Sequence, residues 1–211
     1  VFDWDGSAWT QRGADIDGEA AGDKSMYLSM SNDGNTVAIG AQGNDGNGTD
    51  SGHVRVFDWD GSAWVQRGSD IDGEAAGDNF SVVEMNNDGN TVAVGAWEND
   101  GNGTGSGHAR VFDWSGSAWT QRGSDIDGEA AGDWASGVAI SSDGNTLALG
   151  AQRNDGNGTD SGHVRVFDYT STGIFTLAEN ETAIGAVTAT DVEGDPLTYT
   201  LTGTDASSFS I

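Results

Sequence analysis

Hydrophobic residues along the chain either alternate with polar residues or form short runs, and turn-forming residues bound each stretch. In one representative segment Met26, Leu28 and Met30 alternate with polar residues, and the next apolar run covers Thr36 to Ala41. Asn, Asp and Gly separate these two stretches, a composition typical of tight hairpin turns. No stretch has the 3.6-residue period of an amphipathic helix. The pattern therefore predicts an all-β protein built from short antiparallel strands.

Two more strands complete the pattern. The third runs from His53 to Trp59 and carries apolar residues on both of its faces. The fourth runs from about Ala63 to Gly68, after a short Asp-Gly-Ser turn. Trp59 and Trp64 flank this turn, so we expect their rings to pack across the hairpin. A strand with two apolar faces belongs to a sheet that is covered on both sides.

The four-strand pattern repeats along the chain with a period of 55 residues. The motif VFDWDGSAW and its variants begin at Val1, Val56, Val111 and Val166. We therefore expect repeats at 1–55, 56–110 and 111–165 and the start of a fourth at 166, so that the repeat region covers residues 1–170. Near-identical units in series are the signature of a repeat architecture.

Four short antiparallel strands per repeat, covered on both faces, match the blade of a β-propeller. The strand from Thr36 to Ala41 fits this interpretation, because its small residues Ala38 and Gly40 share one face, as expected near the axis where blades converge. Three repeats are fewer than the four to eight blades of ordinary propellers, so we predict a partial propeller. A β-solenoid stack is the alternative.

Composition narrows the range of partners. The chain has 34 Asp and Glu against 8 Lys and Arg, a net charge of −26, so it would repel nucleic acid and anionic lipid. No apolar run approaches the roughly 18 residues of a membrane span, so we expect no membrane insertion. The absence of Cys excludes disulfides and thiolate metal sites. Eight Trp, seven Phe and three Tyr favour a folded chain over a disordered acidic tail.

Two segments of each repeat place oxygen-bearing side chains at alternate positions. Such alternation can direct several oxygens at one Ca²⁺, which binds six to eight of them. The first segment, DIDGEAAGD, supplies Asp15, Asp17, Glu19, Asp23, Asp70, Asp72, Glu74, Asp78, Asp125, Asp127, Glu129 and Asp133. The second, NDGNGT, supplies Asp45, Asn47, Thr49, Asp100, Asn102, Thr104, Asp155, Asn157 and Thr159. Calcium is the predicted cofactor; a solvated acidic connection and a plain long turn are the alternatives.

Differences between the repeats add two hypotheses. Asp50 and Asp160 correspond to Gly105 in the middle repeat, which argues against a calcium site that needs this acid. The repeats differ most in two segments: the first strand, which in a propeller lines the central channel and begins near Trp134 in the third repeat, and the pair of residues after the second strand, which is Trp97-Glu98 in the second repeat. Trp97 and Trp134 are therefore candidate ligand-binding residues suited to stacking on sugar rings; different packing around an asymmetric axis is the alternative.

The histidine and arginine that recur in every repeat are predicted to have structural roles. His53, His108 and His163 occur once per repeat, each two residues before an arginine, and we expect them to lie far from the mixed ligands that zinc requires. Arg55, Arg110 and Arg165 are expected to pair with the abundant carboxylates. No nucleophile elbow, phosphate-binding loop or paired carboxylates distinct from the repeats occur, so we predict that the chain is not an enzyme. A sialidase-like hydrolase would need a cluster of non-repeating acids and arginines.

A strand, a DG turn, VAIGA, an Asp- and Gly-rich loop and then GHVRVFDW together resemble the FG-GAP repeat of integrin-α-type β-propellers, in the variants found in marine bacterial and algal proteins. The resemblance covers residues 1 to about 170. Integrin-type repeats carry a calcium loop between the first two strands, whereas SNDGNT at Ser31, NNDGNT at Asn86 and SSDGNT at Ser141 are too short for it. That calcium site is therefore not transferred to this chain.

Residues 174–211 are similar to the opening of a bacterial cadherin-like domain, and the resemblance implies an incomplete β-sandwich segment there. It also implies that Glu179, Asp191 and Glu193 correspond to calcium-coordinating acids of that family, although Glu193 stands where the family usually has Asp. Giant surface adhesins commonly join the two kinds of module.

These observations favour a non-catalytic adhesion or matrix protein that is secreted to the cell surface or the extracellular matrix and responds to calcium. The alternatives are a structural subunit of an extracellular fibre and a carbohydrate-binding, lectin-like propeller. The expected partners are other copies or modules of the same surface protein, with glycans or cell-surface proteins as further candidates.

Overall fold

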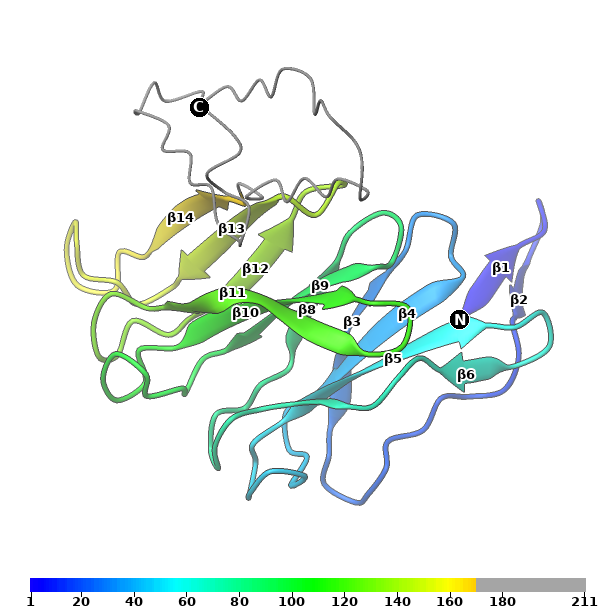
Figure 1. Ribbon diagram of the computed structural model, residues 1–211, viewed down its shortest axis with the longest axis horizontal. Helices are drawn as coiled ribbons and strands as arrows, with labels where there is room; N and C mark the ends of the chain where they lie inside the picture. Colours follow the sequence, from blue (N-terminus) through cyan, green and yellow to red (C-terminus); the bar gives the residue numbers. More distant parts are fainter. Residues whose placement is uncertain (170–211) are drawn as a thin grey trace, which may run out of the picture. The chain divides into compact units, whose positions relative to one another are not determined.

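The computed structural model describes residues 1–169, which form only β-strands and connecting turns (Figure 1). No helix in this part of the chain is long and apolar enough to cross a membrane. The prediction of an all-β protein with propeller-type blades is confirmed, and the sheets of residues 1–169 do not close into a ring. The predictions for residues 174–211, including the incomplete β-sandwich, lie outside the described residues.

Three sheets follow one another along the chain, each with its strands antiparallel and in sequence order. The first contains β3 (Ser25–Met30), β4 (Thr36–Ala41), β5 (His53–Trp59) and β6 (Trp64–Gln66), and β7 (Ile71–Asp72) also pairs with β5. The second contains β8 (Val82–Met85), β9 (Thr91–Ala96), β10 (His108–Trp114) and β11 (Trp119–Asp127). The third contains β12 (Ala135–Ile140), β13 (Thr146–Ala151) and β14 (His163–Asp168).

A two-stranded hairpin precedes these sheets. Its strands are β1 (Phe2–Trp4) and β2 (Trp9–Gln11), which correspond to the third and fourth strands of a repeat. The second sheet lies between the first and the third, as the continuous change of colour in Figure 1 shows.

The predicted strand bounds hold for β4 and β5, and the predicted ring pairing holds at the hairpin that follows β5. Trp59 and Trp64 are directly opposite in the register, with ring centroids 5.4 Å apart. The fourth strand differs from the prediction. In the first sheet it ends at Gln66 and the DIDGE segment pairs with β5 as a separate strand, β7, whereas in the second sheet one strand continues to Asp127. The DIDGE isoleucine pairs with the third strand in both sheets, and Ile71 is buried.

Consecutive sheets pack face to face through apolar side chains. Between the first and second sheets, Val54 and Val56 of β5 share one buried cluster with Val83 and Met85 of β8. Between the second and third sheets, Ala109 and Val111 of β10 share a cluster with Leu147 and Leu149 of β13 and with Ala135. Each sheet that has a neighbour on both sides is therefore covered on both faces, as the apolar pattern of the third strand predicts.

Glycine allows the close approach of neighbouring sheets. A Cβ atom on Gly40 would lie 1.9 Å from the carbonyl oxygen of Ser81, and one on Gly95 would lie 2.0 Å from that of Ser136. No side chain fits at these distances, so the second strand of one sheet lies directly against the chain at the start of the next. This contact accounts for the small residues predicted to lie on one face of the second strand.

Candidate functional sites at the repeat junctions

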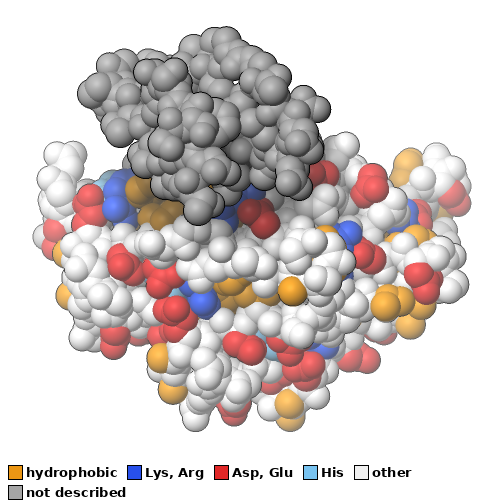
Figure 2. Space-filling view, viewed as in Figure 1, with side chains coloured by type: hydrophobic (Ala, Val, Ile, Leu, Met, Phe, Trp, Pro, Cys, Tyr) orange, Lys and Arg blue, Asp and Glu red, His pale blue; other side chains and the backbone are white. Residues whose placement is uncertain are grey.

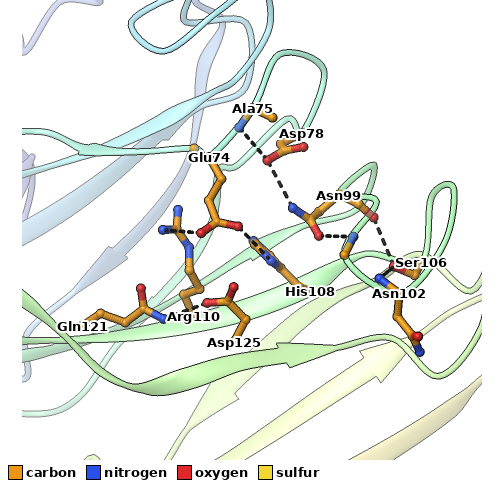
Figure 3. Close-up of polar contacts among 12 residues, drawn as sticks. Glu74, Ala75, Asp78, Asn99, Asn102, Ser106, His108, Arg110, Gln121 and Asp125 are labelled. Carbon is orange, nitrogen blue, oxygen red and sulfur yellow. Dashed lines mark hydrogen bonds and ion pairs between the residues drawn. The ribbon is translucent and has the colours of Figure 1, made fainter.

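The segment that connects one sheet to the next brings acidic side chains to the buried start of the third strand. At the junction between the first two sheets, Glu74 follows β7, His108 and Arg110 begin β10, and Asp125 lies on β11 (Figure 3). The preceding junction has the same arrangement, built from Glu19, His53, Arg55 and Asp70. Each arrangement joins two consecutive units of the stack, because the glutamate lies on the connecting segment before the sheet that contains the histidine.

We call Glu19, His53 and Asp70 the first junction cluster, and Glu74, His108 and Asp125 the second. In each cluster one histidine nitrogen and one oxygen from each carboxylate all lie within 4.8 Å of one another. His53 Nδ1 is 3.8 Å from Glu19 Oε2 and 3.7 Å from Asp70 Oδ2. His108 Nδ1 is 3.9 Å from Glu74 Oε2. These distances exceed those of hydrogen bonds.

The prediction that the histidines lie far from other ligating side chains is therefore wrong for His53 and His108. The prediction assumed that each histidine begins a separate strand with no metal-ligating side chain nearby. In the structure, the DIDGE segments bring carboxylates to the strands of His53 and His108. His163 lies 3.6 Å from Glu129, and no third ligating group joins them among residues 1–169.

The arginine beside each histidine fixes the glutamate. Arg110 Nη1 lies 3.5 Å from Glu74 Oε1, and its Nη2 donates a hydrogen bond of 2.7 Å to the backbone carbonyl of Asp72. The guanidinium also lies 4.4 Å from the centroid of the Phe80 ring. Arg55 makes the equivalent contacts with Glu19 and the Asp17 carbonyl. The predicted pairing of these two arginines with carboxylates is confirmed.

Burial controls the charges in the second junction cluster. Burial lowers the pKa of His108, and the neighbouring charge of Arg110 lowers it further. Burial also raises the pKa of Glu74, while Arg110 opposes this shift. An imidazole with a lowered pKa is neutral at pH 7, so one of its nitrogens has a free lone pair.

The structure separates the predicted calcium residues of a single DIDGEAAGD segment. Asp70 accepts a hydrogen bond of 2.7 Å from the Gln66 side chain, whereas Asp78 is buried and accepts bonds from the backbone of Ala75 and the side chain of Asn99. The other repeats have the same hydrogen bonds at Asp15, Asp125, Asp23 and Asp133. In residues 1–169 no group of three histidine or carboxylate side chains with ligand atoms within 4.8 Å of one another comes from one such segment alone.

The NDGNGT segments form hydrogen-bonded turns that also link consecutive repeats. Asp45 Oδ1 accepts a bond of 2.8 Å from the backbone of Asp50, and the Asn47 amide donates to the carbonyls of Gly73 and Glu74 at 2.8 Å each. Asp100 and Asn102 make the equivalent bonds in the next repeat. In the third repeat, Asp155 accepts the equivalent bond from the backbone of Asp160. A hollow of about 410 Å³ brings residues of both segments together; it is lined by Glu74, Asp78, Glu98, Asp100 and Thr104, among others.

The change from Asp50 and Asp160 to Gly105 has a conformational explanation. All three residues have a positive φ, of 52°, 50° and 60° respectively. Glycine adopts this conformation readily and aspartate tolerates it. The shared requirement at this position is therefore the turn geometry, which Gly105 satisfies without a carboxylate.

The two candidate ligand-binding tryptophans line one hollow of about 860 Å³. Its lining includes Trp97, Trp134, Tyr27, Ser136 and Val164. Trp134 has a φ of 54°, an uncommon conformation for a bulky residue, and the Arg153 guanidinium lies 3.3 Å from its ring centroid. Sequence analysis placed these two residues on variable segments, and the structure brings them to the same surface. Glu179, Asp191 and Glu193 lie outside the described residues.

No protein-family model matches the sequence, and no curated protein matches it either. Among solved structures, the chain is similar to TolB from Acinetobacter baumannii, with 18% identity and a TM-score of 0.40 over 71% of this chain and 33% of that chain. It is also similar to the tricorn protease, with 10% identity and a TM-score of 0.37 over 61% of this chain and 11% of that chain. The chain thus matches a third or less of either structure, and at these values neither likeness carries an argument about function.

Proposed function

We propose that the chain is a non-catalytic extracellular adhesion or matrix module whose repeats assemble head to tail with those of a second copy. One observation carries the proposal: the two open faces of the three-sheet stack are the two halves of the interface that joins consecutive repeats within the chain. The extracellular setting is supported by the net charge of −26 and by the resemblance to repeats of surface proteins.

The first open face belongs to β3 and comprises Met26, Leu28 and Met30, which we call the back face. All three side chains are exposed, and Leu28 is 67% exposed. Its equivalent in the next repeat, Val83, is 4% exposed because the preceding sheet covers it. The back face is therefore an exposed apolar surface at the position where, in the next repeat, a preceding blade packs.

The second open face belongs to β14 and comprises Val164 and Val166, which we call the front face. Val164 is 66% exposed, whereas its equivalent in the first repeat, Val54, is completely buried against the second sheet. No described residue covers the front face as the second sheet covers Val54.

Val164 at the front face of one copy and Leu28 at the back face of another would meet as their equivalents in consecutive repeats already do. For this contact the β1–β2 hairpin, which occupies the place of the third and fourth strands of a preceding repeat, would have to move aside. The repeats are nearly identical in sequence, so this contact would reuse an apolar interface that is packed twice within the chain. Such a contact is heterologous: it closes into a ring if the rotation permits, and otherwise extends into a filament. The ring would be an adhesive propeller, and the filament would be a fibre built from this subunit.

Light scattering on the 211-residue chain at increasing protein concentration tests the proposal. We expect the mass to rise above the 21.7 kDa of one chain, and we expect Val164→Asp and Leu28→Asp each to prevent this rise, because a carboxylate would be buried at the contact. Val65→Asp is the matched control, since Val65 is an exposed valine of β6 outside both faces.

Mixing the two variants distinguishes head-to-tail assembly from other association. Val164→Asp retains an intact back face and Leu28→Asp retains an intact front face, so an equimolar mixture should give dimers and nothing larger. A wild-type chain that stays monomeric at every concentration would refute the proposal. So would a mixture of the variants that stays monomeric while the wild type assembles.

We also propose that calcium binding in an acidic hollow promotes the assembly. The hollow lined by Glu74, Asp78, Asp100 and Thr104 has the oxygen ligands that Ca²⁺ prefers. We expect the assembly measured by light scattering to be greater in excess CaCl₂ than in excess EDTA at the same ionic strength, which separates calcium binding from screening. Equal masses in the two solutions would remove calcium from the proposal and leave the head-to-tail contact untouched.

A carbohydrate-binding function is the second candidate, and the hollow lined by Trp97 and Trp134 favours it. Aromatic rings at a concave surface suit stacking on sugar rings. Trp134→Asn is a suitable variant, because Asn79 occupies the equivalent position with the same positive φ. We expect it to remain folded and to lose binding on a glycan array; equal binding by the variant would exclude the hollow as the site.

A further inference from the structure

We propose that the two junction clusters each bind a divalent transition-metal ion of the Zn²⁺ class through one histidine and two carboxylates. The ligand sets are Glu19, His53 and Asp70 at the first junction, and Glu74, His108 and Asp125 at the second. This proposal does not depend on the proposed adhesive function. It also differs from the predicted calcium sites, because each set joins a histidine to acids from two DIDGE segments.

The buried histidines are the strongest support. The His108 side chain is fully buried, and neither of its ring nitrogens has a hydrogen-bond partner among the described residues. The His53 side chain is 1% exposed, and within residues 1–169 its Nδ1 has no partner either. Buried polar atoms without partners are rare in proteins, and a bound ion is one of the accepted explanations. His53 Nδ1 lies beside both carboxylates of its cluster, and His108 Nδ1 lies beside Glu74, with Asp125 completing the second cluster (Figure 3).

The geometry needs only a small closure of flexible side chains. Zinc binds nitrogen and oxygen at about 2.0–2.2 Å, so neighbouring ligand atoms in a tetrahedral site lie about 3.3 Å apart. Three of the four histidine–carboxylate separations are 3.7–3.9 Å, and all ligand atoms of a cluster lie within 4.8 Å of one another, so they must move closer to bind an ion. The side chains of Glu19 and Glu74 are 42% exposed, so no packed neighbour in the described part of the chain prevents a small rotation that keeps Oε1 at the arginine. Three protein ligands leave a fourth position for water.

The surrounding charges suit a dication. Two carboxylates and a neutral imidazole carry two negative charges, which a divalent ion balances. The guanidinium of Arg110 is adjacent, but it lies against Glu74 Oε1 and leaves Oε2 toward His108. An imidazole ligand favours zinc, copper, iron or nickel over calcium or magnesium, which prefer oxygen ligands alone.

Each site would connect two repeats. The glutamate lies on the segment that leads into a sheet, whereas the histidine and the aspartate belong to that sheet itself. A bound ion would therefore depend on correct packing of the two blades and would stabilise the junction between them, because a ligand that binds only the folded state shifts the folding equilibrium toward it.

Calorimetric titration of the 211-residue chain with ZnSO₄ tests the proposal. Excess CaCl₂ and about 0.15 M NaCl would suppress weak binding to the acidic surface. We expect two Zn²⁺ ions per chain. Glu74→Gln should bind one ion, and the double variant Glu19→Gln with Glu74→Gln should bind none. Glu98→Gln is the matched control, because Glu98 is an exposed acid near the second junction but outside its cluster.

A second measurement identifies the ligands. Substituting Co²⁺ for Zn²⁺ should give visible absorption bands of a four-coordinate site with nitrogen and oxygen ligands, and these bands should be absent in the double variant. Circular dichroism would verify that the glutamine variants remain folded. The absence of saturable Zn²⁺ binding would overturn the proposal. Binding that the double variant retains in full would also overturn it, because the ions would then be held by the acidic surface.

Discussion

At the scale of single residues, the hairpin turns of the repeats fix the charge of an exposed acid. Asp33 lies between β3 and β4 and accepts hydrogen bonds from the Ser31 hydroxyl at 2.7 Å, the Asn35 backbone at 3.0 Å and the Asn35 side chain at 2.9 Å. These bonds stabilise the carboxylate and lower the pKa of Asp33 to about 2, with the Ser31 bond making the largest contribution. The carboxyl is exposed, so its contribution to stability is small.

The pKa of Asp33 predicts a specific effect of pH on folding. An unfolded aspartate titrates at about 3.9, so between about pH 4 and pH 2 the unfolded chain binds more protons at this position than the folded chain. The stability that the turn gains above about pH 4 is therefore lost as the pH falls toward 2. We expect an NMR titration of the Asp33 carboxyl in the folded chain to have its midpoint near 2.

The Asp33→Asn variant isolates this effect from that of the other acids. An amide in place of the carboxyl does not titrate, so the free energy of unfolding of the variant should fall less between pH 4 and pH 2 than that of the wild type. A carboxyl midpoint near 4, or equal losses in the two proteins, would contradict the role given to the Ser31 and Asn35 hydrogen bonds.

At the scale of the strands, two equivalent glycines have different surroundings. A Cβ on Gly95 of β9 would lie 2.0 Å from the Ser136 carbonyl oxygen, whereas a Cβ on Gly150 of β13 would meet no atom nearer than 3.6 Å. Gly95→Ala should therefore lower the free energy of unfolding by about 2 to 3 kcal/mol through overpacking. Gly150→Ala should change it by less than about 1 kcal/mol, because alanine suits a strand better than glycine does.

Urea unfolding of the two alanine variants at low protein concentration provides the comparison. The two variants differ only in whether a following sheet packs against the substituted residue, so each serves as the control for the other. Equal losses in the two variants would show that the tight contact at Ser136 is not a determinant of stability. At high concentration Gly150→Ala should also weaken head-to-tail assembly, because Gly150 would then meet a second copy as Gly95 meets Ser136.

The strands were predictable from the sequence because their signals are local. Alternation, turn residues and the Trp59–Trp64 pair lie within a few residues of one another, and the structure confirms them. The length of the fourth strand was not predictable, since it depends on whether the residues before the DIDGE isoleucine stay in one strand with it, as they do in β11 and do not between β6 and β7. The spacing of the motifs in the sequence predicts one blade per repeat, but it does not predict which residues of consecutive blades are in contact.

The junction clusters were beyond the reach of sequence analysis for a related reason. Glu74, His108 and Asp125 come from three segments, and the contact crosses from one repeat to the next. Because every repeat contains the same three residue types, the sequence does not reveal whether a histidine meets the DIDGE glutamate that precedes it or the one that follows it. The distinction rests on blade packing, in which the segment that connects two sheets reaches the third strand of the later sheet.

At the scale of the whole molecule, acidic charge opposes the association that the apolar faces favour. Figure 2 shows carboxylate side chains scattered over the visible face, with few lysines and arginines among them. The net charge of −26 makes two copies repel each other at a distance, while the contact between front and back faces is short-ranged and apolar. Ionic strength therefore decides which of the two effects prevails.

The balance predicts that assembly increases with salt. At about 0.01 M ionic strength the Debye length is roughly 30 Å, so the charges of two copies repel over most of a blade, whereas at about 0.15 M it falls to roughly 8 Å. The mass measured by light scattering should therefore rise with NaCl for the wild type and stay at one chain for Val164→Asp at every concentration of salt. Assembly through ion pairs would weaken as NaCl is added, so a mass that falls with salt would show that the copies meet through charged residues instead of through the open apolar faces.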